Sequence, residues 1–493
     1  MNTIYIINTS FSTNSFLSGK LGVSNYSEIV LGKKKYVETL IDKLGIEARN
    51  VVLTTDKVVT WKELYKSISD GFIYQGDLSN TNLIYYSARF FPIGENKIKF
   101  AIKKAAAISE KTFFKNELMR LEEPYIFSVP YLEVLRKRDS DEMLLVDLQR
   151  ESIDVDLTQS MLDLENPTDS ILLFNQNLDK RYFNSISVDN CYYFVKQSFK
   201  TDKMEAEYNF LSNVPASLRP FFPHVGVFYK DSQTASYQVE KIFSFDAAVL
   251  FKNGSFQKEE VFRDFLEKIQ DCLDTAPKKK VDGVVYREQM HSLFVDKVRK
   301  RIQETKKLME IDRLEILAKL EGFGSYDDFC DQLLFSVEKI VKKKSRNELH
   351  FSHGDLCASN IMFDTASKQL KLIDPRGWNK SIDETYRPQI YDICKLSHSF
   401  LGNYDYIMSD MFTLQLDQQG IALHFNKPEF QDFEVASIFT KFVEKNGISI
   451  RELRLLEATL FLSMIPLHQD SLSHMSAQFV QAMHLFKKGM KWL

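Results

Sequence analysis

Over roughly the first 165 residues, short apolar runs alternate with amphipathic stretches. The apolar runs at 4–7, 51–53 and 83–86 predict buried strands, and the stretches near 35–44 and 104–120 predict helices. Strands that alternate with helices favour an open, largely parallel sheet. Residues 1–165 are therefore predicted to form an α/β domain.

From about residue 170 the predicted strands follow one another more closely. Apolar runs at 171–174 and 191–196 predict two strands, separated by a polar, turn-prone stretch. A helix is predicted at 203–211, and a further strand at 236–242. This pattern indicates a small, β-rich lobe over 166–245.

The pattern becomes mainly helical in residues 246–493. Helices are predicted at about 257–273, 289–320 and 325–344, and the central one carries apolar residues at mixed three- and four-residue spacing. Residues 430–493 are also predicted to be helical. Together these segments predict a large helical lobe.

One stretch at 351–377, FSHGDLCASNIMFDTASKQLKLIDPRG, breaks the helical pattern and carries polar residues at a chemically meaningful spacing. Asp355 is followed five residues later by Asn360. Two apolar runs joined by a turn-rich segment then predict a β-hairpin that returns Asp374 to the side of the loop. In phosphoryl transfer, a loop carboxylate orients the acceptor hydroxyl, while an Asn and a second Asp hold the magnesium that bridges the phosphates.

With Gly354 in place of Arg and no Phe-Gly after Asp374, this stretch resembles the aminoglycoside phosphotransferase and choline kinase-like family. The resemblance covers about 170–493. It implies an α+β protein-kinase-like two-lobed fold, with the α/β open-sheet domain in front. It also implies that Asp355 is the catalytic residue, that Asn360 and Asp374 hold Mg²⁺, and that ATP is the phosphate donor.

The same resemblance implies further nucleotide-binding residues in the small lobe. Lys196 ends an apolar strand and would hold the ATP phosphates, positioned by Glu207, with Glu205 as the alternative. Glu240 and Ile242 lie in the segment where such kinases join their lobes and meet the adenine edge.

Residues 175–190 contain no glycine, so the sequence shows no glycine-rich phosphate clamp. Ser185 and Ser187 are the nearest candidates to cover the phosphates. In the large lobe, Asp392 is predicted to brace the catalytic loop. Arg376 has two interpretations, of which pairing with a nearby carboxylate is favoured over contact with an anionic acceptor or the transferring phosphate.

The front domain is faintly similar to the late part of sugar nucleotidyltransferase domains, at 123–135 and 166–169. Those enzymes open with a glycine-rich, basic loop that grips a triphosphate. The first predicted strand here leads instead into 8–12, which contains neither glycine nor a basic residue. A degenerate, scaffolding or sugar-sensing domain is therefore favoured over a second active site.

Composition narrows the class of protein further. The net charge of −3 argues against a general nucleic-acid binder, and 44% apolar with 27% charged residues is ordinary for a globular protein. The five cysteines are scattered without a C-x-x-C pair, which argues against a disulfide framework and a zinc site and fits a reducing compartment. No signal peptide and no membrane-length apolar stretch is evident, so a cytoplasmic location is predicted.

These observations predict a small-molecule kinase that uses ATP and Mg²⁺ to phosphorylate an alcohol. The acceptor is expected to be a sugar, polyol or amino alcohol of surface-polysaccharide metabolism, by analogy of fold. Two alternatives remain open: a catalytically weak pseudokinase or scaffold, and a bifunctional nucleotidyltransferase-kinase. The sequence does not indicate an oligomeric state.

Overall fold

The computed structural model describes most of the chain, in two compact units that span Met1–Leu178 and Asp179–Leu493. The described residues are 2–11, 15–56, 58–71, 81–93, 97–108, 110–115, 126–157, 160–176, 184–188, 192–344, 346–417, 420–427 and 435–490. The two units are described separately below.

The first unit is built on a six-stranded sheet with the order β4-β1-β5-β8-β7-β9. The strands are β1 (Asn2–Asn8), β4 (Val51–Thr54), β5 (Thr81–Ser87), β7 (Thr112–Lys115), β8 (Ile126–Pro130) and β9 (Ile153–Asp156). β1 pairs in parallel with β4 and β5, and β7 with β9, but β8 is antiparallel to both of its neighbours. The sheet is therefore mixed, where the sequence predicted a largely parallel one.

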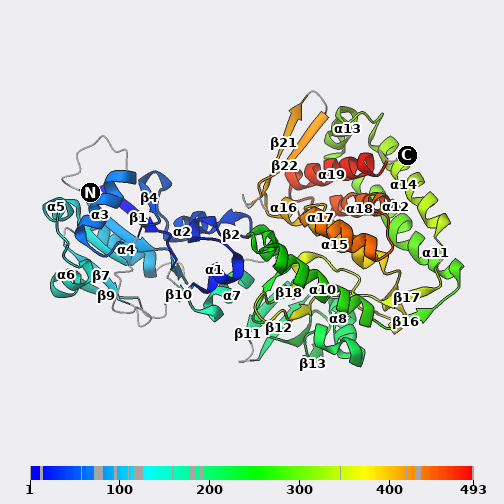
Figure 1. The fold of residues 1–493 in the computed structure, drawn as a ribbon, viewed down its shortest axis with the longest axis horizontal. Helices are drawn as coiled ribbons and strands as arrows, with labels where there is room; N and C mark the ends of the chain where they lie inside the picture. Colours follow the sequence, from blue (N-terminus) through cyan, green and yellow to red (C-terminus); the bar gives the residue numbers. More distant parts are fainter. Residues whose placement is uncertain are drawn as a thin grey trace. The chain divides into compact units, whose positions relative to one another are not determined.

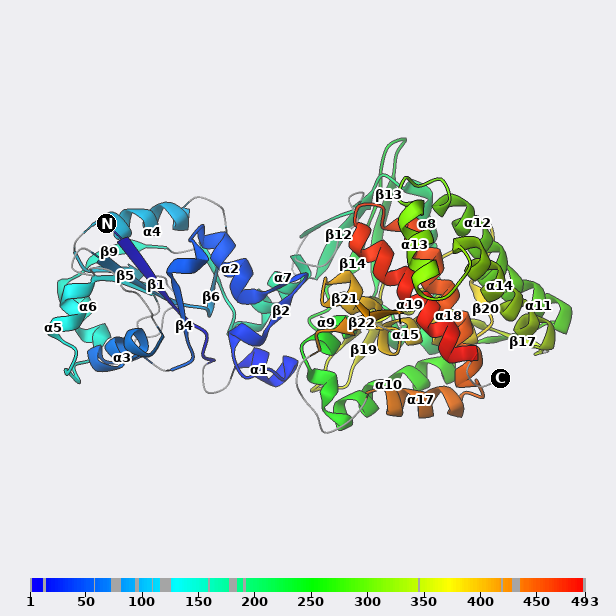
Figure 2. The same ribbon diagram turned by 90° about the horizontal axis from the view of Figure 1, so that it is seen from above.

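Helices cover both faces of this sheet (Figure 2). One face carries α3 (Trp61–Gly71), α5 (Tyr131–Arg136) and α6 (Leu144–Glu151), and the other carries α2 (Tyr36–Leu44) and α4 (Lys97–Ala107). Trp61, Leu64 and Phe127 are fully buried between the sheet and the first set of helices. The remaining elements are α1 (Phe16–Leu21), α7 (Pro167–Gln176), and the short pairs β2 (Val30–Leu31) with β3 (Lys34–Lys35) and β6 (Phe90–Pro92) with β10 (Met161–Asp163).

The second unit begins with a four-stranded antiparallel sheet in the order β11-β12-β14-β13. Its strands are β11 (Asn184–Val188), β12 (Tyr193–Ser198), β13 (Val225–Lys230) and β14 (Ala235–Glu240), and α8 (Thr201–Ser212) packs against the last two. Two small sheets follow, β15-β18-β19 and β16-β17-β20. They comprise β15 (Phe245–Asp246), β18 (Ile361–Phe363), β19 (Leu370–Leu372), β16 (Lys278–Lys280), β17 (Glu348–Phe351) and β20 (Tyr386–Arg387).

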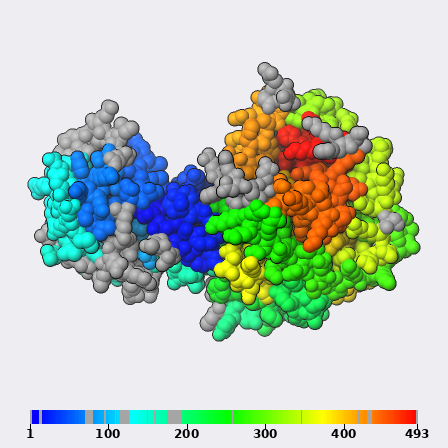
Figure 3. Space-filling model, in the orientation of Figure 1, coloured from blue at the N-terminus to red at the C-terminus, as the bar shows by residue number. Residues whose placement is uncertain are grey.

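Helices make up most of the rest of the second unit (Figure 1). They are α9 (Ala247–Lys252), α10 (Glu259–Thr275), α11 (Gly283–His291), α12 (Lys297–Thr305), α13 (Ile311–Leu320), α14 (Tyr326–Lys343), α15 (Ile390–Phe400), α16 (Tyr404–Met408), α17 (Val435–Lys445), α18 (Ile450–Met464) and α19 (Leu472–Met490). A hairpin of β21 (Phe412–Asp417) and β22 (Gly420–Phe425) completes the unit. α10 and α17 lie side by side and form part of the outer surface (Figures 1, 2 and 3).

Three of the predicted elements are wrong. The run at 171–174 lies in helix α7 rather than in a strand, because Asn166 accepts a hydrogen bond from the N–H of Thr168 and Pro167 starts the helix. A run of four apolar residues fits a buried helix as well as a strand, so pattern alone could not decide. The helix predicted at 104–120 corresponds to α4, which ends at Ala107, followed by strand β7.

The third error concerns the long helix predicted at 289–320. The helix begins earlier, at Gly283, and passes through a π-helical turn at Ser292–Asp296 into α12. It ends at Thr305, and α13 is a separate helix. None of the helices within the described residues is long and apolar enough to span a membrane.

Candidate active site

A buried lysine and glutamate form the first part of the site. Lys196 is the fourth residue of β12, and Glu207 lies on α8; their side chains are 7% and 3% exposed. The ammonium of Lys196 donates to Oε1 of Glu207, which also accepts a hydrogen bond from the hydroxyl of Tyr237 on β14. Glu205, the alternative partner, is on the surface, where it pairs with Lys230. The predicted Lys196–Glu207 pair is therefore present.

Asp374 joins this pair from a distant part of the chain. Its Oδ1 is 2.6 Å from Nζ of Lys196, and its side chain remains 46% exposed. The predicted hairpin is confirmed: Ile361 pairs with Leu372 and Phe363 with Leu370, and Asp374 follows β19 with a left-handed φ of 57°. Asp tolerates this backbone region better than most residues, and such conformations concentrate at functional sites.

The charges of these three groups depend on one another. Burial favours the neutral amine of Lys196, but the carboxylates of Asp374 and Glu207 outweigh it and raise the pKa of Lys196. Although burial acts in the opposite direction, the Lys196 ammonium lowers the pKa of Asp374. The ammonium and the Asp374 carboxylate are therefore both retained at neutral pH.

Asn360 lies directly beside Asp374 at the base of the hairpin. The N–H of Ile373 donates to the carbonyl of Asn360 at 2.9 Å, which places the two predicted metal ligands next to each other. The side-chain amide of Asn360 donates from Nδ2 to the carbonyl of Asp355, also at 2.9 Å, so its Oδ1 is oriented as an acceptor. Two oxygen ligands of this kind suit Mg²⁺, which is usually held by few protein groups together with phosphates and water. Among the described residues no group of three or more His, Cys, Asp or Glu side chains is arranged to hold a metal.

His353 connects the loop to the strand that delivers Asp374. Its Nε2 donates to the carbonyl of Ile373 at 2.8 Å, and its Nδ1 accepts from the N–H of Asp355 at 3.3 Å. Burial lowers the pKa of His353, so the ring is neutral and can donate and accept in this way. As predicted, Asp392 braces the loop: its carboxylate accepts from the N–H groups of His353 (3.1 Å) and Gly354 (2.9 Å).

Two glycines allow the backbone to approach its neighbours closely. Gly354 has a φ of +78°, and a Cβ there would lie 2.9 Å from Nη1 of Arg387 and from Cβ of Arg376. A Cβ on Gly377 would lie 1.5 Å from the carbonyl oxygen of Ala206 on α8. The segment 373–377 is therefore packed between the catalytic loop and the helix that carries Glu207.

Asp355 is paired with a lysine that the sequence interpretation did not use. Nζ of Lys395, on α15, lies 2.9 Å from Oδ1 of Asp355. Burial raises the pKa of a carboxyl, but the charges of Lys395 and Arg376 outweigh it and hold the pKa of Asp355 well below its usual range. Lys395 could have been suspected from its position, because it lies one helical turn after Asp392 in a helix whose residues are all buried.

Of the two residues predicted to meet the adenine edge, Glu240 and Ile242, only Ile242 has a backbone donor without a partner among the described residues. The N–H of Glu240 already donates to the carbonyl of His224, and its carboxylate accepts from the N–H of His224. Ile242 follows β14, and within the described part of the chain its backbone N–H makes no hydrogen bond. Ile242 is thus better placed than Glu240 to offer its backbone to a base. Ser185 and Ser187 lie on β11, and their side chains are outside the described structure.

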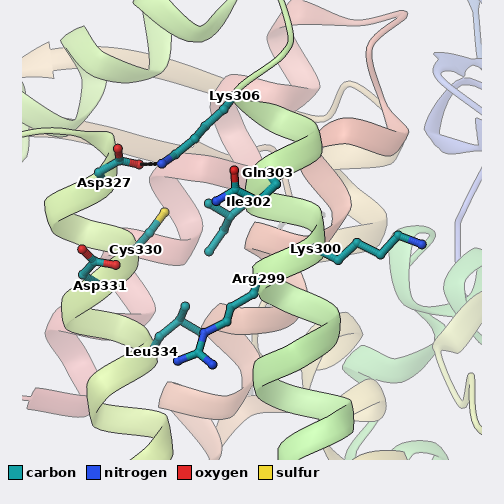
Figure 4. Close-up of a pocket in the computed structure, with 9 residues that line it drawn as sticks. All are labelled: Arg299, Lys300, Ile302, Gln303, Lys306, Asp327, Cys330, Asp331 and Leu334. Atoms are coloured by element: carbon teal, nitrogen blue, oxygen red, sulfur yellow. Dashed lines mark ion pairs between the residues drawn. The ribbon is translucent and has the colours of Figure 1, made fainter.

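A pocket of about 430 Å³ lies between α12 and α14 and is lined by none of the site residues (Figure 4). Two of its cationic groups are in ion pairs: Lys306 lies 2.6 Å from Asp327, and Arg299 2.5 Å from Glu338. Burial raises the pKa of the Cys330 thiol, which makes it unreactive. The thiol of this pocket is therefore not a nucleophile.

Taken together, the antiparallel sheet with its Lys196–Glu207 pair, the braced loop and the returning hairpin define a kinase-like fold. The predicted two-lobed α+β architecture is confirmed.

Comparison with solved structures finds distant similarities. The chain is similar to a thermostable mutant of aminoglycoside phosphotransferase APH(4)-Ia, at 9% identity and a TM-score of 0.39, covering 62% of this chain and 94% of that one. It is also similar to glucosamine kinase (11% identity, TM-score 0.37, 64% and 77% covered). A third similar structure is aminoglycoside phosphotransferase APH(3'')-Id from Streptomyces rimosus, with ADP and streptomycin (14% identity, TM-score 0.33, 56% and 86% covered). No protein-family model and no curated protein matches the chain.

These similarities are distant, so the function proposed below rests on the geometry of the site.

Proposed function

We propose that this protein is an ATP-dependent phosphotransferase that moves the γ-phosphate to a hydroxyl group of a small molecule. The observation that carries the proposal is the contact of Lys196 with both Glu207 and Asp374, residues that lie on three separate elements. A lysine held between two carboxylates has no structural need for the second one. Phosphoryl transfer does need both, one to position the lysine and one to hold a cation.

ATP would bind with its phosphates at Lys196. The ammonium has donors for the phosphate oxygens, and Glu207 and Tyr237 keep it in place from the buried side. Mg²⁺, held by Asp374 and Oδ1 of Asn360, would neutralise charge on the phosphates. Nζ of Lys196, 2.6 Å from Oδ1 of Asp374, partly neutralises the carboxylate that would hold the metal.

Asp355 would accept the hydrogen bond of the acceptor hydroxyl and orient its oxygen toward the γ-phosphorus. The low pKa of Asp355 makes it a weak base, so the proton would be transferred late, when bond formation has made the hydroxyl acidic. In this mechanism the rate comes mainly from positioning and from charge neutralisation.

The acceptor is proposed to be a sugar, polyol or amino alcohol of surface-polysaccharide metabolism. The distantly similar structures include an aminoglycoside phosphotransferase and glucosamine kinase, and we therefore propose a sugar-like alcohol for this chain as well. A panel of such alcohols, assayed for ADP release, tests this substrate class.

The experiment that tests phosphotransfer itself is a set of thermal scans with and without Mg–ATP. Wild type should gain several degrees in Tm, because a ligand that binds only the folded state stabilises it by RT ln(1 + [L]/Kd). Asp374→Asn should lose most of this gain while its ligand-free Tm stays close to that of wild type, since Lys196 keeps Glu207 as its partner. Lys230→Gln, which breaks an exposed ion pair of the small lobe, is the matched control. An unchanged gain in Asp374→Asn would show that Asp374 holds no metal and would favour the pseudokinase alternative.

The bifunctional alternative depends on the first unit. The loop after β1 uses its own backbone donors: the N–H of Thr9 donates to Thr54 and that of Ser10 to the side chain of Asn8, both at 2.8 Å. Donors that are already paired cannot cradle a triphosphate. We therefore expect the full-length Asp374→Asn variant to release no pyrophosphate from nucleoside triphosphates and sugar phosphates. Saturable release would reinstate the bifunctional alternative.

A further inference from the structure

Four cationic side chains gather around Asp355, and they are called the basic group below. Its members are Lys297 at the start of α12, Arg376 after β19, Arg387 at the end of β20 and Lys395 on α15. They come from four separate segments of the chain. Their proximity is therefore not explained by one charged helix face or by a run of basic residues in the sequence.

Contacts with the catalytic loop show how closely the group is assembled. Lys395 lies 2.9 Å from Asp355, and both Arg376 and Arg387 would be touched by a Cβ at the preceding residue, Gly354. Lys297 donates to the hydroxyl of Tyr391 at 3.0 Å, and Tyr391 precedes Asp392, which braces the same loop. Lys395 and Arg376 therefore act directly on the charge of Asp355, while Arg387 lies beside Gly354 and Lys297 beside Tyr391, in the same part of the structure.

The cations outnumber the carboxylates that face them. Lys395 pairs with Asp355. Asp392 is the carboxylate with the largest electrostatic effect on Arg387, but the oxygens of Asp392 already accept hydrogen bonds from two backbone N–H groups. Glu384, which also acts on Arg387, is exposed and accepts from the N–H groups of Asn379 and Lys380. The guanidinium of Arg376 makes no ion pair or hydrogen bond within the described residues, although its side chain is accessible. Arg376 thus lacks the close carboxylate ion pair that was the favoured prediction, although its charge acts on that of Asp355.

The pKa of the buried Tyr391 hydroxyl reflects the excess of positive charge in the basic group. Tyr391 is fully buried, and burial by itself raises the pKa of a phenol. The charges of Lys297, Lys395 and Arg376 nevertheless lower the pKa of Tyr391 to about 8. A π-helical turn at Ser292–Asp296 directly precedes Lys297, and such turns are frequent at functional sites.

We propose that the basic group is an anion subsite for the acceptor, and that the acceptor is an alcohol carrying a phosphate monoester. This inference rests on the proposed phosphotransferase function and deepens it. Arginine and lysine side chains from several directions match the three oxygens of a phosphate, and Arg376 offers a planar, unpaired fork at the accessible end. The same group would repel a cationic amino alcohol without a phosphate, so phosphorylated sugars and polyols are favoured within the proposed acceptor class. In the transfer, the acceptor oxygen bonds to the γ-phosphorus as the bond to ADP breaks, and its proton passes to Asp355.

Binding is tested with inorganic phosphate as the probe, on full-length protein saturated with Mg–AMP-PNP so that the γ-phosphate position is occupied. Potassium chloride keeps the ionic strength constant. Wild type should show a saturable rise in Tm with phosphate, and Arg376→Gln and Lys297→Gln should raise the phosphate Kd at least tenfold. Arg299→Gln, an exposed arginine of the same helix α12, is the control and should behave as wild type. A phosphate response no larger than that of chloride overturns the proposal, as does an unaltered response in both variants.

Turnover measurements test whether the bound anion is a phosphate group of the acceptor or a carboxylate. ADP release is compared within matched pairs: glycerol with glycerol 3-phosphate, and glucosamine with glucosamine 6-phosphate, with glycerate as the carboxylate arm. The phosphorylated member of at least one pair should have the larger kcat/KM, and Arg376→Gln should raise its KM more than it lowers kcat. Higher kcat/KM for the unphosphorylated members or for glycerate overturns the assignment to phosphate.

The two proposals fail in different ways. If Mg–AMP-PNP itself gives no rise in Tm, the phosphotransferase function fails. If Mg–AMP-PNP stabilises the protein but phosphate does not, the function stands and the anion subsite is wrong.

Discussion

The loop after β1 in the first unit and the segment after β19 in the second use polar residues in opposite ways. In the first, Asn8 is buried and its amide bonds the carbonyl of Asp56, the hydroxyl of Tyr85 and the N–H of Ser10. Every polar atom of that side chain serves the local structure. In the second, Asp374 keeps nearly half of its side chain exposed, and Arg376 keeps an unpaired guanidinium.

The difference lies in what stabilises each loop. In the first unit, the backbone N–H groups of Thr9 and Ser10 already donate to the carbonyl of Thr54 and the side chain of Asn8, so they are not available to a ligand. In the second unit, His353 and Asp392 brace the loop through hydrogen bonds to its backbone and to the carbonyl of Ile373. Because the hydrogen bonds of His353 and Asp392 hold the loop in place, Asp355, Asn360 and Asp374 remain available to bind the acceptor and the metal.

The largest expected effect is on Asp355. Asp355→Ala should lower kcat by about 10²–10⁴-fold, because the acceptor hydroxyl loses its hydrogen-bond acceptor. The rise in Tm with Mg–ATP should persist, since Lys196, Asn360 and Asp374 are untouched. The measurements are steady-state ADP release and paired thermal scans. If kcat stays within threefold of wild type, Asp355 does not act on the acceptor.

The next effect concerns close packing in the second unit. Gly377→Ala should destabilise this unit by about 3 kcal/mol, because the new Cβ would overlap the carbonyl oxygen of Ala206 and displace α8 with Glu207. Gly19→Ala in helix α1 of the first unit is the contrast, since a Cβ there meets nothing within 4 Å. It should stabilise the helix by about 0.5–1 kcal/mol.

Thermal unfolding and Mg–ATP affinity measured on both glycine variants check this prediction. Weaker Mg–ATP binding is expected only for Gly377→Ala, because Lys196 loses its alignment. Equal behaviour of the two variants would mean that segment 373–377 has room to relax.

A smaller effect is predicted for the loop of the first unit. Asn8→Ala should cost about 1–3 kcal/mol, because the N–H of Ser10 and the hydroxyl of Tyr85 lose a buried partner. Faster amide exchange should appear in β1 and β4, as measured by hydrogen–deuterium exchange, while ADP release stays unchanged. A loss of phosphotransfer in this variant would show that the first loop contributes to the reaction.

The smallest expected effect is a change in the pKa of Tyr391. Tyr391 should ionise near pH 8, and Lys297→Met should move this pKa upward toward 10, because one of the cations that lower it is removed. The pKa of Tyr391 is lower in the folded state than in the unfolded state, where it is near 10. Its ionisation therefore adds fully to the free energy of unfolding above pH 10, and this contribution is lost as the pH falls through 8. Ultraviolet difference absorbance of tyrosinate, with Tyr391→Phe as the reference, measures the transition. If no transition near pH 8 disappears in Tyr391→Phe, the positive surplus around Asp355 is smaller than inferred.

Local spacing was enough to predict much of the second unit. Asp355, Asn360 and the hairpin before Asp374 lie within twenty residues of one another, so short-range geometry and turn chemistry place them together. The Glu207 register on α8 follows in the same way from helical periodicity. The absence of glycine and basic residues at 8–12 likewise indicated a loop with no phosphate grip.

Tertiary structure alone decided which charges meet. Lys196 contacts Asp374 across 178 residues of chain, and Arg376, Arg387, Lys395 and Lys297 come from four elements whose relative positions no local pattern encodes. The helix at 167–176 shows the same limit, since a buried four-residue run satisfies either periodicity until packing selects one. Sequence spacing thus determined the candidate chemistry of the loop. The positive surroundings of Asp355 arise only from long-range packing, because the interaction between charges depends on their distance in space and not along the chain.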